Sequence, residues 1–167
     1  MNFAKYQETH PNASYTPRYE DTGYFLLKYL PRQGGNSQCT GDKDLNYRNN
    51  LRVYRYAETL LNAAELILRT GGDTAEAQNY LDQVRARAYR TTVENLGAHK
   101  VVANIDNVLE ERHLELYGEG KRFWDLVRSG KANEVLGSRG YKDNKKYLPI
   151  PSSEIDKSAG TLTQNPY

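Results

Sequence analysis

Apolar residues recur at helical spacing through the middle of the chain. The positions that alternate at intervals of three and four residues are Tyr54, Ala57, Leu61, Ala64 and Leu68. This period predicts an amphipathic helix over residues 53–68, with Val53 widening its apolar stripe. We expect Gly71-Gly72 to end this helix, because glycine adopts the left-handed conformation of a helix C-terminus without a steric penalty.

A second amphipathic helix is predicted directly after this break. Asp73 is a suitable N-cap, and Glu76 stands three residues later, where a capping box has its acidic member. The apolar positions of the second helix are Ala77, Tyr80, Leu81, Val84 and Ala88. Because so short a connection separates the two helices, we expect them to be antiparallel neighbours.

Two further helices are predicted after a polar stretch over residues 89–102. Asn104 is the expected N-cap of the third helix, whose apolar stripe extends through residues 105–117. Gly118-Glu119-Gly120 should interrupt the chain before the fourth helix. Trp124 belongs to that fourth helix, and its size and apolar neighbours place it in the predicted core.

The pattern divides the chain into three parts. Residues 1–50 form an irregular, loop-rich lead-in, in which residues 22–30 are apolar enough for a strand or a buried extended piece. Residues 51–136 hold the two helix pairs. Residues 137–167 form a coil tail that we expect to pack on the helices, and residues 152–154 can begin one helical turn within it.

The alternation of large and small residues in the first helix pair is typical of a tetratricopeptide repeat. Glu65 stands where that repeat has a small residue, so the match is partial. The sequence therefore predicts an all-α fold of tetratricopeptide-like antiparallel helix pairs. Because such stacks usually need about three repeats, the rest of the chain is expected to cap them.

Composition narrows the function classes. The chain has 167 residues, and its 23 Lys and Arg against 21 Asp and Glu give a net charge of +2, which does not favour a nucleic-acid partner. The single Cys39 excludes an internal disulfide and a cysteine zinc cluster.

The first residues lack the features of a secretory signal. Taken alone, this predicts a cytoplasmic chain or a piece of a longer exported protein.

Carboxylates recur at intervals of four residues in the third helix, at Glu111, Glu115 and Glu119. This spacing is repulsive unless cations face it. We expect arginines of the same helical hairpin to be the partners, because a guanidinium binds carboxylates with two parallel hydrogen bonds. The members of this predicted structural network are Glu111, Arg112, Glu115, Glu119, Arg122, Asp125 and Arg128.

Two catalytic interpretations of the same region compete with this network. A glycoside hydrolase would use two carboxylates as an acid–base pair, yet neighbouring arginines should lower their pKa values, the wrong direction for a general acid. Glu110 and His113 have the Glu-x-x-His spacing of di-iron proteins, but a second copy is lacking. We therefore expect no catalytic residue, no metal and no cofactor.

Tyrosine is the unusual residue of this chain, with 14 copies against 3 Phe and 1 Trp. Aromatic faces stack on sugar C–H surfaces, and the phenol adds a hydrogen bond at the rim. Tyr15, Arg18 and Tyr19 lie in a proline-bearing loop and form the candidate glycan-binding cluster. The alternative hypothesis is that the tyrosines simply pack in a half-buried layer.

Several segments, in the same order, resemble the C-terminal half of the SusD/RagB family. One is the stretch from Leu109 to Arg128, which includes Tyr117-Gly-Glu-Gly-Lys-Arg-Phe-Trp124. The other segments that carry the resemblance are residues 22–30, 50–65, 77–88, 148–154 and 164–166. Together they cover the chain from about Thr22 to its end, so the signal is more specific than any one motif.

The resemblance implies a surface-exposed outer-membrane lipoprotein of Bacteroidetes that binds an oligosaccharide or polysaccharide and works in nutrient uptake with a TonB-dependent, SusC-like transporter. It implies membrane attachment only through a lipid anchor, for which this sequence offers no site, and a chain that is a C-terminal scaffold piece. We therefore predict non-catalytic glycan binding. A helical scaffold for a protein or peptide partner is the alternative, followed by a carboxylate-dependent glycoside hydrolase.

Overall fold

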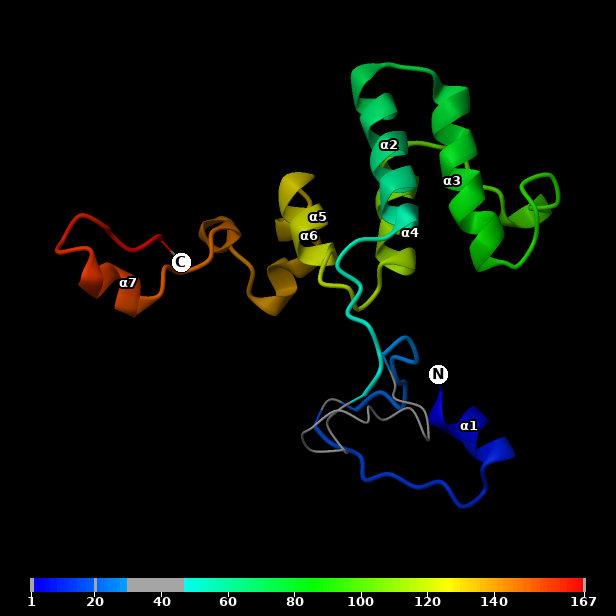
Figure 1. The fold of residues 1–167 in the computed structure, drawn as a ribbon, viewed down its shortest axis with the longest axis horizontal. Helices are drawn as coiled ribbons and strands as arrows, with labels where there is room; N and C mark the ends of the chain where they lie inside the picture. Colours follow the sequence, from blue (N-terminus) through cyan, green and yellow to red (C-terminus); the bar gives the residue numbers. More distant parts are fainter. Residues whose placement is uncertain (1, 20, 30–46, 167) are drawn as a thin grey trace. The chain divides into compact units, whose positions relative to one another are not determined.

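The computed structural model describes residues 2–19, 21–29 and 47–166. The chain forms two compact units, Met1–Tyr54 and Arg55–Tyr167. All regular elements in the described ranges are helices, which confirms the predicted all-α fold (Figure 1). None of these helices is long and apolar enough to cross a membrane. Cys39 lies outside the described residues.

The first unit contains a short helix that the sequence pattern did not predict. Helix α1 spans Phe3–Thr9 and is capped by the side chain of Asn2. None of its residues is buried, which agrees with the lack of an apolar period by which the sequence could have revealed this helix. The expectation of a strand or a buried extended piece over residues 22–30 is wrong within its described part, where Tyr24 forms one isolated bridge to Asn2 and Leu27 is exposed.

Helix α2 of the second unit spans Tyr56–Thr70 and starts later than predicted. Arg55 has an extended backbone, with φ −139°, and serves as the N-cap. Val53 and Tyr54 therefore precede the helix and are exposed, so their predicted places in the apolar stripe are wrong. The helix ends at Gly71, whose φ of 70° is the left-handed conformation expected there.

Helix α3 spans Thr74–Ala88. Its N-cap is Asp73, which accepts a hydrogen bond from the Ala75 N–H at 2.8 Å. The predicted capping box is not formed, because Glu76 accepts the hydroxyl of Tyr80 instead. The cap therefore consists of the aspartate alone.

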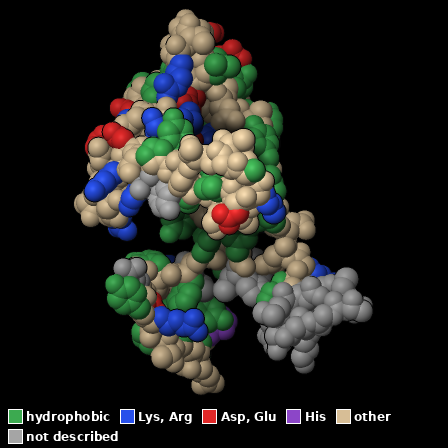
Figure 2. Space-filling model, turned by 90° about the vertical axis from the view of Figure 1, so that its left-hand side faces the viewer, with side chains coloured by type: hydrophobic (Ala, Val, Ile, Leu, Met, Phe, Trp, Pro, Cys, Tyr) green, Lys and Arg blue, Asp and Glu red, His purple; other side chains and the backbone are tan. Residues whose placement is uncertain are grey.

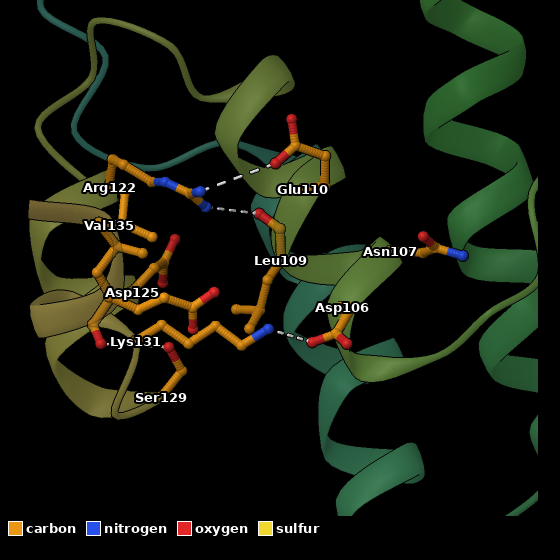
Figure 3. A pocket seen from close by; sticks show the side chains of 11 residues that line it. Asp106, Asn107, Leu109, Glu110, Arg122, Asp125, Ser129, Lys131 and Val135 are labelled. Carbon is orange, nitrogen blue, oxygen red and sulfur yellow. Dashed lines mark hydrogen bonds and ion pairs between the residues drawn. The ribbon is translucent and has the colours of Figure 1, made fainter.

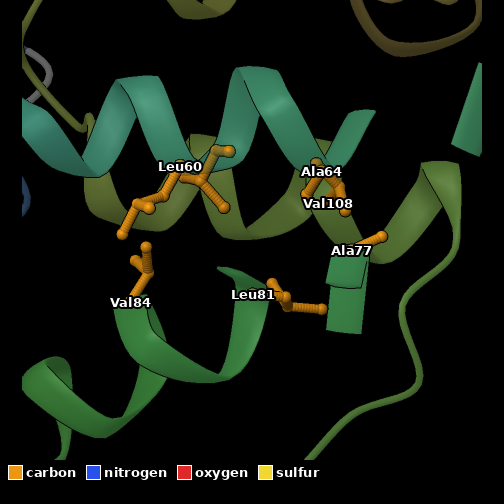
Figure 4. Close-up of a cluster of buried hydrophobic side chains, with 7 residues drawn as sticks. Leu60, Ala64, Ala77, Leu81, Val84 and Val108 are labelled. Atoms are coloured by element: carbon orange, nitrogen blue, oxygen red, sulfur yellow. The ribbon is translucent and has the colours of Figure 1, made fainter. Parts of the chain in front are cut away.

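Helices α2 and α3 are antiparallel, and α4 (Ile105–Glu115) packs against both of them (Figure 1). Figure 4 shows Leu60 of α2 and Val84 of α3 pointing toward one another inside this group. The buried residues of this core are Leu60, Leu61, Ala64, Ala77, Leu81, Val84 and Val108. These side chains come from the predicted apolar stripes, so the periodicity positioned the core.

Helices α5 (Arg122–Arg128) and α6 (Ala132–Leu136) follow the glycine break. Helix α5 buries Asp125 and Leu126, whereas Trp124 is 48% exposed. The prediction of Trp124 as a core residue is therefore wrong. A helix of two turns buries one face only, and here that face holds the Asp125 carboxylate, which meets Arg112 of α4 and Arg128 of α5 itself.

The last part of the chain is held by hydrogen bonds within its own sequence. The Gln164 side chain exchanges two hydrogen bonds with the backbone of Ile150, at 2.8 and 2.9 Å, and Asn165 donates one to the Leu148 carbonyl. Packing of this tail on the helices stays a prediction. The remaining short helices of the second unit are η1 Gly97–His99, η2 Gly137–Arg139, η3 Asp143–Lys146 and α7 Ser152–Lys157.

Candidate functional site

The structure brings the three predicted binding residues together at one hollow of the first unit. Tyr15, Arg18 and Tyr19 all line this hollow, whose volume is about 620 Å³. We call it the tyrosine hollow. Its remaining lining residues are Thr16, Asp21, Thr22, Tyr24 and Phe25.

Asp21 fixes the loop that forms the tyrosine hollow. Its carboxylate accepts hydrogen bonds from the backbone N–H groups of Gly23, at 2.7 Å, and Arg18, at 3.3 Å. It also accepts the hydroxyl of Tyr15 at 3.4 Å. Asp side chains commonly bond nearby backbone groups in turns, so a single residue closes this loop on itself. Gly23 has the positive φ, 71°, that the turn requires.

Tyr15 is half-buried between two other aromatic rings. Its ring meets Phe3 at 4.3 Å and Phe25 at 5.1 Å between centroids, both in edge-to-face geometry. Loss of solvent around its hydroxyl and the adjacent Asp21 carboxylate raise the pKa of Tyr15. Tyr15 is thus part of the packed floor of the hollow. For this tyrosine, the structure agrees with the alternative hypothesis that the tyrosines pack in a half-buried layer.

The rim of the hollow presents exposed aromatic rings. Tyr19 is 93% exposed and Tyr24 is 68% exposed. The exposed Arg18 adds a cation beside them. Sequence reasoning missed Tyr24 because the apolar stretch around it predicted a strand. The nearness of Tyr24 to Tyr19 in the sequence was the signal that could have found it.

The carboxylates of α4 are paired with arginines, but the partners differ from those expected. Glu111 accepts from Arg85 of α3 at 2.6 Å. Arg55, the N-cap of α2, donates to Glu115 at 2.6 Å and to Glu119 at 2.9 Å. Arg87 of α3 donates to Glu115 as well. The cations therefore come from the first helix pair instead of the hairpin.

The arginines of the predicted network serve a second group of carboxylates. Arg112 donates to Asp125 at 2.9 Å and lies 3.6 Å from Glu58. Arg128 donates to Glu65 and to Asp125, each at 2.7 Å. These bonds tie α2, α4 and α5 together. Glu58 and Glu65 of α2 are both buried, and these cations compensate their charges.

Arg122 stands apart from both groups. It donates to the backbone carbonyl of Leu109 at 3.2 Å and lies 3.7 Å from the exposed Glu110. The structure thus places Arg122 at the surface, where it meets none of the buried carboxylates described above.

The pKa values of two network carboxylates move in opposite directions. Burial raises the pKa of Glu111, and the hydrogen bond from Arg85 only partly offsets this. Burial would also raise the pKa of Glu65, but hydrogen bonds from Arg128 and Arg69 outweigh it and lower this pKa. The expectation that arginines lower these pKa values is therefore wrong for Glu111, which is 4% exposed.

The surface of the helical unit shows no single sign of charge on the face in Figure 2, where acidic and basic side chains are interspersed. Across the described ranges, no three His, Cys, Asp or Glu side chains are grouped as a metal site requires. His113 lies 3.5 Å from Glu110, and Glu110 also lies 3.7 Å from Arg122.

Comparison with known proteins gives one consistent result. The sequence profile of the SusD family matches residues 4–167. SusD-like protein P2 of Formosa agariphila is 32% identical over 153 residues, covering 84% of this chain and 30% of that protein. SusD-like protein P38 of the same organism is 42% identical over 95 residues, covering 53% of this chain and 18% of that protein.

Solved structures show the same similarity. Surface glycan-binding protein A from Bacteroides thetaiotaomicron has a TM-score of 0.82 and 47% identity, covering 99% of this chain and 35% of that chain. Its complex with laminarihexaose has a TM-score of 0.81. A laminarin binding SusD-like protein has a TM-score of 0.80 and 42% identity, covering 99% of this chain and 33% of that one. The chain spans about a third of the length of these solved relatives.

Proposed function

Because the chain belongs to the SusD family, we propose that it takes part in non-catalytic glycan binding and that the tyrosine hollow contacts the sugar. The observation that carries this proposal is the pair of exposed rings, Tyr19 and Tyr24, beside the exposed Arg18 on a loop closed by Asp21. Sugar C–H faces stack on such rings, and guanidinium and carboxylate groups bind the hydroxyls.

The ligand we propose is a laminarin-type oligosaccharide. Two structural relatives support this class, one solved with laminarihexaose and one described as laminarin binding. Their identity to this chain, 47% and 42% over 99% of its length, is high enough for the comparison to extend beyond the fold. Glu115 and Glu119 are both held by Arg55, at 2.6 and 2.9 Å, which further supports binding without hydrolysis.

We also propose that the protein works at the cell surface with a TonB-dependent, SusC-like outer-membrane transporter. Family membership supports this partner and this location. We expect the tagged chain to co-purify with such a transporter from detergent-solubilised outer membranes of its native cells. Recovery of the tagged chain from the soluble fraction, with no outer-membrane transporter, would contradict the proposal.

Replacing Tyr19 by alanine should weaken laminarin binding without unfolding the protein. The lost stacking is expected to reduce affinity by about three- to tenfold. Because the side chain is 93% exposed, the free energy of unfolding should stay within about 0.5 kcal/mol of the wild type. Electrophoretic retardation in gels that contain laminarin measures the affinity, and a thermal melt measures the stability.

Tyr147→Ala is the matched control, since Tyr147 is an exposed tyrosine of the tail with Lys146 over its ring at 5.0 Å. This variant should be retarded as strongly as the wild type. Equal retardation of Tyr19→Ala and the wild type would remove the tyrosine hollow from the site. A folded wild type that ignores laminarin and every other glycan tested would favour the alternative, a scaffold for a protein or peptide partner.

A further inference from the structure

We propose a second saccharide-binding site in the helical unit, at a cleft between α4 and the α5–α6 corner. The cleft has a volume of about 350 Å³ and shares no lining residue with the tyrosine hollow (Figure 3). Its position follows from the side chains that line it, whereas the class of its ligand rests on the proposed function. We call it the α4–α5 cleft.

Charged side chains form the two walls of the α4–α5 cleft. Asp106 and Glu110 stand on α4, while Arg122, Lys131 and Glu134 stand on the opposite wall. Figure 3 shows the Lys131 side chain extending across the cleft to Asp106, and Arg122 reaching Glu110 in the same way. Donors and acceptors thus alternate around one opening.

Both cross-cleft ion pairs can take additional hydrogen bonds. Asp106 is 74% and Glu110 is 56% exposed, so solvent screens these pairs and they contribute little to stability. Each carboxylate keeps acceptor capacity, and the Lys131 ammonium keeps donors, after the pair is formed. Sugar hydroxyls, which donate and accept at once, can therefore bind both members of a pair without leaving a charge unpaired.

The floor of the cleft is rigid and partly apolar. Leu109 and Leu126 are 4% and 3% exposed, and Val135 offers its partly exposed side chain at the wall. Asp125 lies beneath them at 3% exposure, and Arg112 and Arg128 hold its two oxygens. Such a floor keeps its shape, which reduces the conformational entropy lost on binding.

The mixture of charges selects the class of ligand. Three carboxylates of the walls, on Asp106, Glu110 and Glu134, oppose the two cations of Arg122 and Lys131. An anionic ligand would meet the carboxylates and a cationic ligand would meet the cations, whereas a neutral polyol satisfies both. The volume is at the small end of the range of about 300–1,000 Å³ for ligand pockets, which fits a short saccharide.

Amide NMR of the full chain, titrated with laminaritriose, tests this proposal. We expect saturable shifts at Asp106, Ser129 and Val135, in addition to shifts in the tyrosine hollow. Lys131→Ala should weaken the response of the cleft about tenfold, as expected for the loss of a charged hydrogen-bond donor, and leave the response of the hollow unchanged. Tyr19→Ala should do the reverse.

Lys157→Ala is the matched control, because Lys157 also forms an exposed pair with a carboxylate, Glu154, in α7. It should change neither response. Shifts confined to the tyrosine hollow would overturn the second site and leave the proposed function standing. Shifts confined to the cleft would support the second site and overturn the role of the hollow. Absence of both, in a folded chain, would overturn the cleft as a laminarin-type saccharide site together with the proposed ligand.

Discussion

Replacing Arg112 by leucine is expected to lower the free energy of unfolding by about 3–5 kcal/mol. Arg112 is 4% exposed and donates to Asp125 at 2.9 Å and to the side-chain oxygen of Asn62, with Glu58 at 3.6 Å. Its removal withdraws a cation from two carboxylates that are themselves 3% and 6% exposed. Buried charges that lose a partner are costly because the protein interior solvates them poorly.

Urea unfolding followed by circular dichroism at neutral pH measures this loss. Arg69→Leu is the matched control, because Arg69 pairs with Glu65 on the same helix but has a side chain that is 44% exposed. It should cost no more than about 1 kcal/mol. Arg112→Lys keeps the positive charge but loses the planar guanidinium that bonds two groups at once. We expect an intermediate loss in the free energy of unfolding for this variant, which replaces the measurement on Arg112→Leu if that variant fails to fold. A loss below about 1 kcal/mol for Arg112→Leu would contradict the role assigned to this side chain.

The helices could be predicted from the sequence because each long helix has its own apolar period. Leu61 and Leu81, which are fully buried, lie in the stripes that predicted α2 and α3. Neither the existence of helix α1 nor the exposure of Trp124 on α5 could be predicted in this way. Helices α1 and α5 have seven residues each, which is too short to establish a period.

The ionic partners could not be predicted because they come from segments that are distant in sequence. The argument from spacing considered only the hairpin around Glu115, whereas Arg55 and Arg87 reach that carboxylate after the core has brought α2, α3 and α4 together. The burial of Glu65 has the same origin. A polar residue in a helix looks solvated until the partner that lies on another helix is known.

The tyrosine hollow and the α4–α5 cleft differ in how far apart in sequence their residues lie. Tyr15, Arg18 and Tyr19 are neighbours in sequence, and a local turn around Asp21 is enough to bring them together. The walls of the cleft belong to separate helices, and its pairs join residues that are 25 positions apart for Lys131 and Asp106 and 12 positions apart for Arg122 and Glu110. Local sequence therefore indicates the first site, and only the fold reveals the second.

Arg128→Leu should be more destabilising than Arg122→Leu, although the sequence gives both arginines the same expected role. Arg128 bonds Glu65 and Asp125, whose side chains are 5% and 4% exposed. Its loss should lower the free energy of unfolding by about 1–2 kcal/mol, because Arg128 bonds two buried carboxylates. The cost is less than for Arg112, since the Arg128 side chain is 41% exposed and Arg69 and Arg112 continue to serve the same carboxylates. Within the described part of the chain, Arg122 pairs with the exposed Glu110 and donates to a backbone carbonyl, so its loss should stay within about 0.5 kcal/mol.

The pH dependence of the stability difference between wild type and Arg128→Leu distinguishes a lost ion pair from lost packing. Hydrogen bonds from Arg128 and Arg69 hold the pKa of Glu65 below its ordinary value of 4.5, despite its burial. A carboxyl with a lowered folded pKa stabilises the protein above the unfolded pKa, and this stabilisation is lost as the pH falls through the folded value. The difference between wild type and Arg128→Leu should therefore be largest near neutral pH and shrink below pH 4.5. A difference that stays constant through acid would assign the effect to the apolar part of the arginine side chain.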